Sequence, residues 1–296
     1  MVFGAATLDR RSVWTGRVSD PSTRTGPEWT TSNGDTWAEL WEYTDRGLQG
    51  LSSHLLSASL EGSPRNSFRA FEVGCGAGST AIALADARPD ASIVACDISP
   101  ALVRVAQART ADRPNIEVVL GDAEAVAGKR GPFDLIYSRH GVMFFPDPVQ
   151  AFRHLRDSVS PGASIVFSCF QEWQANPWAS ELAAAAAGKT IPPPGRAPSG
   201  FAFAEPDYVM EILTSSGWND AKPRAVNFNY VAGTVESAMT MMTRIGPAAS
   251  VLASLPEDQR EGARDRMQRM LEEHFDGTAV SFPAAAWIWS ARAGSA

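Results

Sequence analysis

Cysteine is scarce in this chain of 296 residues. The three cysteines, Cys75, Cys96 and Cys169, form no CxxC pair and stand at no spacing to histidine that is typical of zinc ligands. An odd, sparse set of thiols predicts neither a disulfide framework nor a metal site. We therefore expect no metal and a reducing compartment.

Long apolar runs and an excess of basic residues are also missing. The longest apolar run, 182–187, is far too short to span a bilayer, and charged residues at 9–11 stand where a secretory signal would have its apolar core. Lys and Arg total 26 against 33 Asp and Glu, which gives a net charge of -7. Because such a surface does not attract a polyanion, we expect a cytoplasmic protein with no nucleic-acid or membrane partner.

The chain divides into a short lead-in and one domain. Residues 1–33 are rich in Ser, Thr, Arg, Gly and Pro without sustained periodicity, which predicts a mobile N-terminal arm. Residues 34–296 are expected to form a single domain that begins with helices over 35–60. Gly47 and Gly50 are expected to break this helical stretch.

Short apolar runs then alternate with helical patterns up to residue 170. Strands that are apolar nearly throughout, each separated by a helix, indicate an α/β fold whose parallel sheet is covered on both faces. An insertion at 171–205 combines an Ala-rich helix with a loop rich in Pro and Gly. Further helices over 234–275 are expected to form a partial cap before a final strand.

A glycine-rich turn follows the first strand. Gly74, Gly76 and Gly78 allow the backbone to turn tightly and approach a ligand, and the next helix offers its free N–H groups. The spacing is Gly-x-Gly-x-Gly, whereas a dinucleotide site has Gly-x-Gly-x-x-Gly, which argues against an NAD-dependent oxidoreductase.

Acidic residues mark the ends of three successive strands. Glu72 precedes the turn, Asp97 stands where a ribose diol needs an acceptor, and Asp122 with Glu124 could meet an adenine amine. A ligand with an amino acid end, a ribose and an adenine fits this set, which predicts S-adenosylmethionine as the cofactor. Each residue also has an alternative role without a cofactor. The glycines could serve tight strand-to-helix packing, Asp97 could cap a helix, and Asp122 and Glu124 could be surface carboxylates.

These residues resemble motifs I, II and III of the class I S-adenosylmethionine-dependent methyltransferases, in the small-molecule branch described as ubiquinone-biosynthesis-like or type 11/12. The resemblance covers about residues 35–170 and rests on three stretches, which are FEVGCGAG, GDAE and residues 139–164. It implies a Rossmann-like, mostly parallel sheet of seven strands with an antiparallel last strand and helices on both faces. The expected cofactor-binding residues are Glu72, Gly74, Cys75, Gly76, Gly78, Asp97, Ile98, Asp122, Ala123, Glu124 and Ser138.

The end of the fourth strand is expected to face the methyl acceptor. It lacks the Asn/Asp-Pro-Pro-Tyr/Phe stretch that methylases of nucleobase or glutamine amino groups have there. His140 is the candidate catalytic residue, because an imidazole suits proton abstraction near neutral pH. It could equally orient the substrate or pack beneath the next turn, and Arg139 could bind an acidic group or pair with a carboxylate.

Tryptophan is abundant, with nine residues against four tyrosines. Several aromatic residues fall before the sheet or after the fifth strand, where they could form a lid over the cofactor or close the core of the cap. The candidate substrate-binding residues are Trp37, Trp41, Arg139, Met143, Trp173, Trp178, Phe201 and Phe203.

The sequence predicts an enzyme that transfers a methyl group by in-line displacement to an oxygen or carbon of a small apolar or aromatic metabolite. One alternative is a regulator or cyclase that binds the cofactor without methyl transfer. Another is a protein or RNA methyltransferase, which the acidic charge disfavours. A homodimer is compatible with the sequence.

Overall fold

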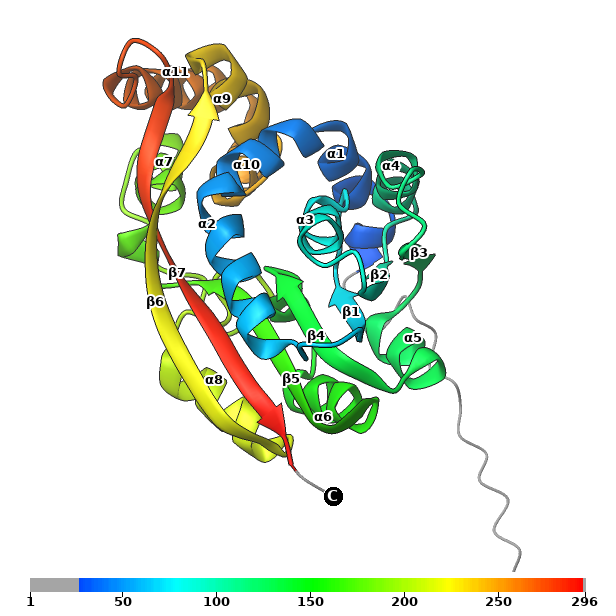
Figure 1. The fold of residues 1–296 in the computed structure, drawn as a ribbon. Helices are drawn as coiled ribbons and strands as arrows, with labels where there is room; N and C mark the ends of the chain where they lie inside the picture. Colours follow the sequence, from blue (N-terminus) through cyan, green and yellow to red (C-terminus); the bar gives the residue numbers. More distant parts are fainter. Residues whose placement is uncertain (1–26, 295–296) are drawn as a thin grey trace, which may run out of the picture.

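The computed structural model describes residues 27–294, which form one seven-stranded sheet with helices around it (Figure 1). The strands are β1 (Arg69–Val73), β2 (Ser92–Asp97), β3 (Ile116–Leu120), β4 (Phe133–Arg139), β5 (Val159–Phe170), β6 (Trp218–Gly233) and β7 (Val280–Ala293). The helices are α1 (Ser32–Glu39), α2 (Trp41–Gly62), α3 (Ser79–Ala87), α4 (Pro100–Arg109), α5 (Ala123–Arg130), α6 (Pro148–Asp157), α7 (Pro177–Ala187), α8 (Pro206–Ser215), α9 (Val235–Met242), α10 (Pro247–Ser254) and α11 (Glu257–Glu273). Short 3-10 turns lie at Pro27–Thr30, Val142–Phe144 and Trp173–Ala175.

The sheet has the order β3-β2-β1-β4-β5-β7-β6. The first five strands are parallel, and β1 lies in their middle, with Ala70 opposite Ile93 on one side and Leu135 on the other. β7 is antiparallel to both β5 and β6. The predicted sheet of seven strands with an antiparallel last strand is confirmed. Because strands β1 to β4 are parallel, their carboxyl ends meet at one edge, where ligands of open α/β sheets bind.

Local capping explains why two of the helices begin where they do. The Ser99 hydroxyl accepts a hydrogen bond from the Leu102 N–H (3.2 Å) at the start of α4, and Pro100 takes the first helical position. Asp147 caps α6 in the same way by accepting from the Gln150 N–H (2.9 Å). These caps fix the direction in which each helix leaves the sheet edge.

The N-terminal segment is only partly within the described residues. Of the predicted arm, residues 1–26 lie outside them, and residues 27–33 form the first 3-10 turn and the start of α1. A Cβ on Gly34 would lie 2.2 Å from the Trp29 carbonyl oxygen and 2.3 Å from Ser99 Oγ. Residue 34 must therefore be glycine for α1 to pack against the start of α4, and this packing brings Trp29 to the sheet edge.

The expectation that glycines interrupt the second helix is wrong, because α2 runs unbroken through Gly47 and Gly50. A Cβ on Gly47 would lie 2.6 Å from Tyr230 Cζ, so glycine here allows α2 to pack closely against β6. Tertiary packing thus outweighs the low helix propensity of the two glycines.

Helices α7, α9, α10 and α11, which all follow β5, form a group at one end of the sheet, whereas α8 packs against α6 and β6. Helices α10 and α11 pack against α7, although about sixty residues or more separate them in sequence (Figure 1). This group, together with the loop 188–205, covers the region beyond the end of β4. None of the helices within residues 27–294 is long and apolar enough to cross a membrane.

Candidate functional site

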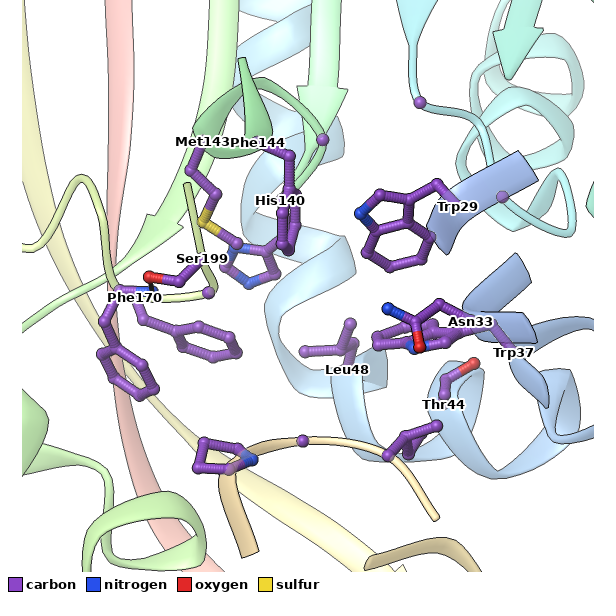
Figure 2. A pocket seen from close by; sticks show the side chains of 18 of the residues that line it. Trp29, Asn33, Trp37, Thr44, Leu48, His140, Met143, Phe144, Phe170 and Ser199 are labelled. Carbon is purple, nitrogen blue, oxygen red and sulfur yellow. Dashed lines mark hydrogen bonds between the residues drawn. The ribbon is translucent and has the colours of Figure 1, made fainter. Parts of the chain in front are cut away.

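One large cavity of about 760 Å³ lies at the carboxyl ends of the first four strands. On one side it is bounded by the glycine turn and by α1 and α2, and on the other by Phe170, the segment 171–205 and α10. Figure 2 shows Trp29, Asn33 and Trp37 on one side, Phe170 on the other, and His140 and Leu48 between them. The cavity therefore joins two unlike halves, which we call the turn half and the aromatic half.

The glycine turn forms the floor of the turn half. Gly74, Gly76 and Gly78 all have positive φ (67°, 54° and 83°), which favours glycine at each position. A Cβ on Gly74 would lie 3.1 Å from the Gly141 Cα, so this glycine also permits a close approach between two chain segments. A Cβ on Gly76 would meet no heavy atom within 4 Å. At Gly76 the bare backbone therefore faces open space in the cavity.

Asp97 lies beside the turn at the end of β2 and lines the cavity. Its carboxylate accepts hydrogen bonds from the N–H groups of Gly76 and Ser99, both at 2.8 Å. Burial raises the pKa of Asp97, and these backbone hydrogen bonds partly offset the effect. Asp97 thus holds the glycine turn in shape and still presents an edge of its carboxylate to a ligand.

The acidic residues after β3 do not themselves line the cavity. The flanking residues Gly121 and Ala123 do, whereas Asp122 caps α5 by accepting from the Ala125 N–H (3.0 Å). Glu124 is buried and contacts His154 Nδ1. At this strand end the backbone, more than the carboxylates, reaches the cavity.

Two further predicted cofactor residues lie beneath the turn. Glu72 is fully buried, where it accepts hydrogen bonds from the hydroxyls of Thr80 and Tyr137 (the latter at 3.0 Å). Burial raises the pKa of Glu72 to about 7. Ser138 donates to the Val73 carbonyl (2.7 Å) and accepts from the Gly141 N–H (3.1 Å). Both residues support the turn without lining the cavity, whereas Cys75 and Ile98 do line it.

A network of charged groups connects α2 to the strand ends. Asp45 accepts from Arg139 (2.8 Å) and from Arg109 (2.9 Å), and Arg139 also donates to Ser52 Oγ (2.9 Å). Burial raises the pKa of Asp45, but the charge and hydrogen bond of Arg139 outweigh it, so the pKa lies below its ordinary value. Two guanidinium groups share one carboxylate, which leaves the network with a net positive charge next to the cavity.

His140 lies where the two halves meet. It has a positive φ of 60°, it is 8% exposed, and its ring stacks on Phe170 with centroids 4.1 Å apart. Neither ring nitrogen has a hydrogen-bond partner. Burial, helped by the charge of Arg139, lowers the pKa of His140 to about 3, so the imidazole is neutral at physiological pH. The Met143 side chain lies beside the ring (Figure 2).

The aromatic half is lined by rings from separate segments. Trp178 stacks on Tyr230 (4.7 Å, 9° between planes), and Phe201 stacks on Phe170 (5.4 Å, 25°). The indole N–H of Trp178 donates to Asn176 Oδ1 and that of Trp173 to the Ile191 carbonyl, both at 3.2 Å. Because these donors are occupied within the protein, the rings offer mainly apolar surface.

The structure brings most of the predicted substrate residues together and leaves two outside. Trp37, Arg139, Met143, Trp173, Trp178 and Phe201 line the cavity. Trp41 instead lies under the guanidinium of Arg109 (3.9 Å), and Phe203 is buried among Phe152, Phe167 and Tyr208, so neither residue lines the cavity.

Sequence reasoning missed several residues that line the cavity. Trp29 and Asn33 fall in the predicted arm, and Asp45 lies in the predicted N-terminal helices but was not among the candidate site residues. The first two carry no motif, because the role of Gly34 beside them depends on the packing of α1 against Ser99. The part of α10 and its lead-in that lines the cavity, 246–253, carries only apolar and small residues and gave no signal.

The glycine turn, the acidic strand end and the strand order together define a Rossmann-like fold. Residues 70–162 match the family described as a methyltransferase domain. Residues 70–162 therefore resemble a methyltransferase domain, which confirms for this region the resemblance seen in the sequence.

Curated relatives match part of the chain. A malonyl-[acyl-carrier protein] O-methyltransferase of Ilyobacter polytropus is 31% identical over 106 residues, which cover 36% of this chain and 39% of the relative. One of the same name from Herminiimonas arsenicoxydans is 25% identical over 62% of this chain and 65% of its own length. A trans-aconitate 2-methyltransferase of Methylobacterium radiotolerans is 33% identical over 31% of this chain and 34% of its own length. The chain thus matches less than two thirds of the length of these relatives.

Solved structures share the fold. The YcgJ protein of Bacillus subtilis superposes with a TM-score of 0.53 at 14% identity, over 82% of this chain and 100% of that one. A phosphoethanolamine N-methyltransferase of Haemonchus contortus, solved with S-adenosyl-L-methionine, superposes with a TM-score of 0.53 at 14% identity. The superposition covers 90% of this chain and 59% of that one. At such low identity these likenesses establish the fold alone.

Proposed function

We propose that this chain is an S-adenosylmethionine-dependent methyltransferase that acts on an oxygen or carbon of a small apolar or aromatic molecule. The observation that carries the proposal is the single cavity that connects the glycine turn to the aromatic half. A cavity of about 760 Å³ falls in the upper part of the range for small-molecule sites, and this leaves room for a cofactor and an acceptor together.

The residues of the turn half fit S-adenosylmethionine. The position where a Cβ of Gly76 would project is open, so the bare backbone there can be approached closely. The Asp97 carboxylate lies at the next strand end and fits the ribose hydroxyls, and the backbone of Gly121 and Ala123 lies where an adenine would follow. The sulfonium would then point toward His140 and the aromatic half.

The cofactor supplies an electrophilic methyl group on a positively charged sulfur, and its leaving group needs no proton. The contribution of the chain is then to hold the acceptor in line and to keep water out, which can supply much of the acceleration. Phe170, Trp178 and Phe201 provide flat apolar walls that suit both tasks. Their π faces also favour the nearby positive charge.

His140 fits a positioning role better than that of a general base. A buried imidazole with a pKa near 3 gains a proton only at considerable cost at neutral pH. It can nevertheless donate one hydrogen bond and accept another. We therefore keep His140 as the candidate residue at the acceptor and assign it to orientation of the acceptor.

Two measurements test the proposed function. Titration calorimetry with S-adenosylmethionine and S-adenosylhomocysteine should show saturable binding. Incubation with a metabolite panel should then give a product heavier by one methyl group in place of one hydrogen. The panel should include hydroxylated aromatic compounds and carboxylic acids of the kinds named in the relatives. Binding without any methylated product would favour the cofactor-binding alternative, and absence of binding would refute the proposal.

We also expect the partner to be a small molecule. The net charge of -7 supports the absence of a nucleic-acid partner, and a cytoplasmic location and a homodimer stay predictions from the sequence.

A further inference from the structure

The charges around the aromatic half favour one kind of acceptor. Among the described residues that line the cavity, the charged ones are Asp45, Asp97, Arg139 and Arg244. Asp97 lies in the turn half, and Asp45 is already shared by two arginines. Arg244 pairs with the exposed Glu39. No free carboxylate within residues 27–294 therefore faces the aromatic half, so a cationic amine there would have only the π faces of the rings to interact with.

Positive charge lies close to His140. Arg139 directly precedes His140, and its charge acts on both the His140 ring and the Tyr230 hydroxyl, which Arg46 also influences. Burial, the main cause of the lowered pKa of His140, opposes any charge at this point, whereas the smaller effect of Arg139 opposes a cation and favours an anion. Asp45 only partly cancels this effect of Arg139, because it faces two guanidinium groups.

The unpartnered imidazole completes the arrangement. Buried polar groups are almost always hydrogen-bonded, so two ring nitrogens without partners at the wall of a cavity need an explanation. The flexible side chain of Met143 points toward the ring (Figure 2). Rotation of this side chain would let a ligand oxygen reach the ring and accept its N–H.

We propose that the methyl acceptor binds as an oxyanion, which accepts a hydrogen bond from the His140 ring N–H, is stabilised by the positive charge of the Arg139 network, and has its apolar body between the rings of the aromatic half. This inference rests on the proposed function and narrows its substrate to acids that are ionised near neutral pH, such as acidic phenols, enols or carboxylic acids. In the transfer the bond between carbon and sulfur breaks and a bond between carbon and oxygen forms. The charge of the oxyanion neutralises that of the sulfonium, so no proton moves and no base is needed.

The test uses 4-nitrophenol, a phenol that ionises near neutral pH and whose phenolate has a visible absorption band. At the pH where half of the free probe is ionised, adding the protein should raise this band, because the site takes up the phenolate. The neutral analogue 4-nitroanisole should bind at least about tenfold more weakly, the difference expected for one hydrogen bond to a charged group. Equal binding of the analogue, a fall of the band, or no binding of either probe would overturn the inference.

Variants of His140 separate the hydrogen bond from the shape of the site. His140→Phe keeps a ring against Phe170 but has no donor, and it should weaken phenolate binding roughly tenfold without changing 4-nitroanisole binding. His140→Asn tolerates the positive φ and keeps an amide donor, so it should retain most of the preference for the phenolate. The matched control is His54→Phe at the exposed residue His54, which should change the binding of neither the phenolate nor 4-nitroanisole.

The probe titration needs no cofactor, so the two proposals can fail independently. Phenolate selectivity without S-adenosylmethionine binding would refute the proposed function and leave the anion site standing. Cofactor binding and methyl transfer with no preference for the phenolate, or with no effect of His140→Phe on it, would refute only the anion site.

Discussion

The two halves of the cavity are built from different materials. In the turn half, backbone and short side chains from consecutive strand ends form the floor, beside Trp29 and Trp37, and hydrogen bonds such as that from Gly76 to Asp97 fix its shape. In the aromatic half, rings come from segments as far apart in sequence as Phe170, Trp178 and Tyr230, and α10 adds small apolar residues. A cofactor that many related proteins share suits a surface made by the backbone. An acceptor that differs from protein to protein suits a surface made by interchangeable side chains.

The strongest test of this contrast is Gly76→Val. The substitution strains the backbone by about 1–2 kcal/mol at a positive φ and also fills the open space where the cofactor is expected. We expect a folded protein whose S-adenosylmethionine binding is no longer detectable by calorimetry. Gly162→Val is the matched control, because Gly162 has a similar φ of 75° and the same open surroundings but lies away from the cavity. Retained binding in Gly76→Val would refute the assignment of the turn half.

The pH dependence of stability probes the support beneath the turn. The pKa of Glu72 is raised from 4.5 to about 7, so the folded state holds its proton more tightly than the unfolded state. Glu72 therefore makes the free energy of unfolding fall as pH rises from about 4.5 through 7. Relative to the wild type, Glu72→Gln should gain on the order of 3 kcal/mol across this window, since one pKa unit corresponds to about 1.4 kcal/mol.

Urea unfolding at a series of pH values measures this gain as the difference between variant and wild type. The lowered pKa of His140 has the opposite sign and makes stability rise with pH between about 3 and 6.5, and it cancels in the difference. Exposed Glu211→Gln serves as the control and should change the profile little. A constant difference between Glu72→Gln and wild type would contradict the burial of an ionisable carboxyl beneath the turn.

Asp97 and Asp122 both follow strands, and comparing them separates cavity lining from helix capping. Asp97→Ala should reduce S-adenosylmethionine affinity by at least about 1.5 kcal/mol, because it removes a charged acceptor and releases the Gly76 N–H. Asp122→Ala should cost about 1 kcal/mol of stability as a lost cap, with a smaller loss of affinity. Calorimetry with thermal unfolding measures both quantities. An equal loss of affinity in both variants would mean that the Asp122 carboxylate also meets the cofactor.

The smallest expected effect concerns the aromatic half. Trp178→Leu removes a stacking partner of Tyr230 and should weaken 4-nitroanisole binding roughly two- to tenfold, while cofactor affinity stays the same. Phe203→Leu changes an aromatic residue that does not line the cavity, so probe binding should be unaffected. If both variants lower cofactor affinity, the two halves do not act separately.

The features that could be predicted from sequence are mainly those of the turn half and the sheet that carries it. The sheet, its order of elements and the Gly74 to Gly78 turn were predictable, because glycine spacing, apolar strands and capping residues act locally. It was not predictable that Trp29 lines the cavity and Trp41 does not. The position of Trp29 depends on how α1 packs against Ser99 at Gly34. For the same reason Glu72 and Ser138, which follow the motif pattern, turned out to be bonded beneath the turn and not to line the cavity.

The parallel sheet, its glycine turn and its acidic strand ends were predictable, since these features depend on residues close together in the chain. Packing between distant segments joins Asp45 to Arg109 and Arg139, buries the His140 ring without a partner for either nitrogen, and encloses one space with rings from β5, α7 and β6. The physical reason is that charge, burial and shape at a site are sums over neighbours from distant segments, and no local pattern records which segments will meet.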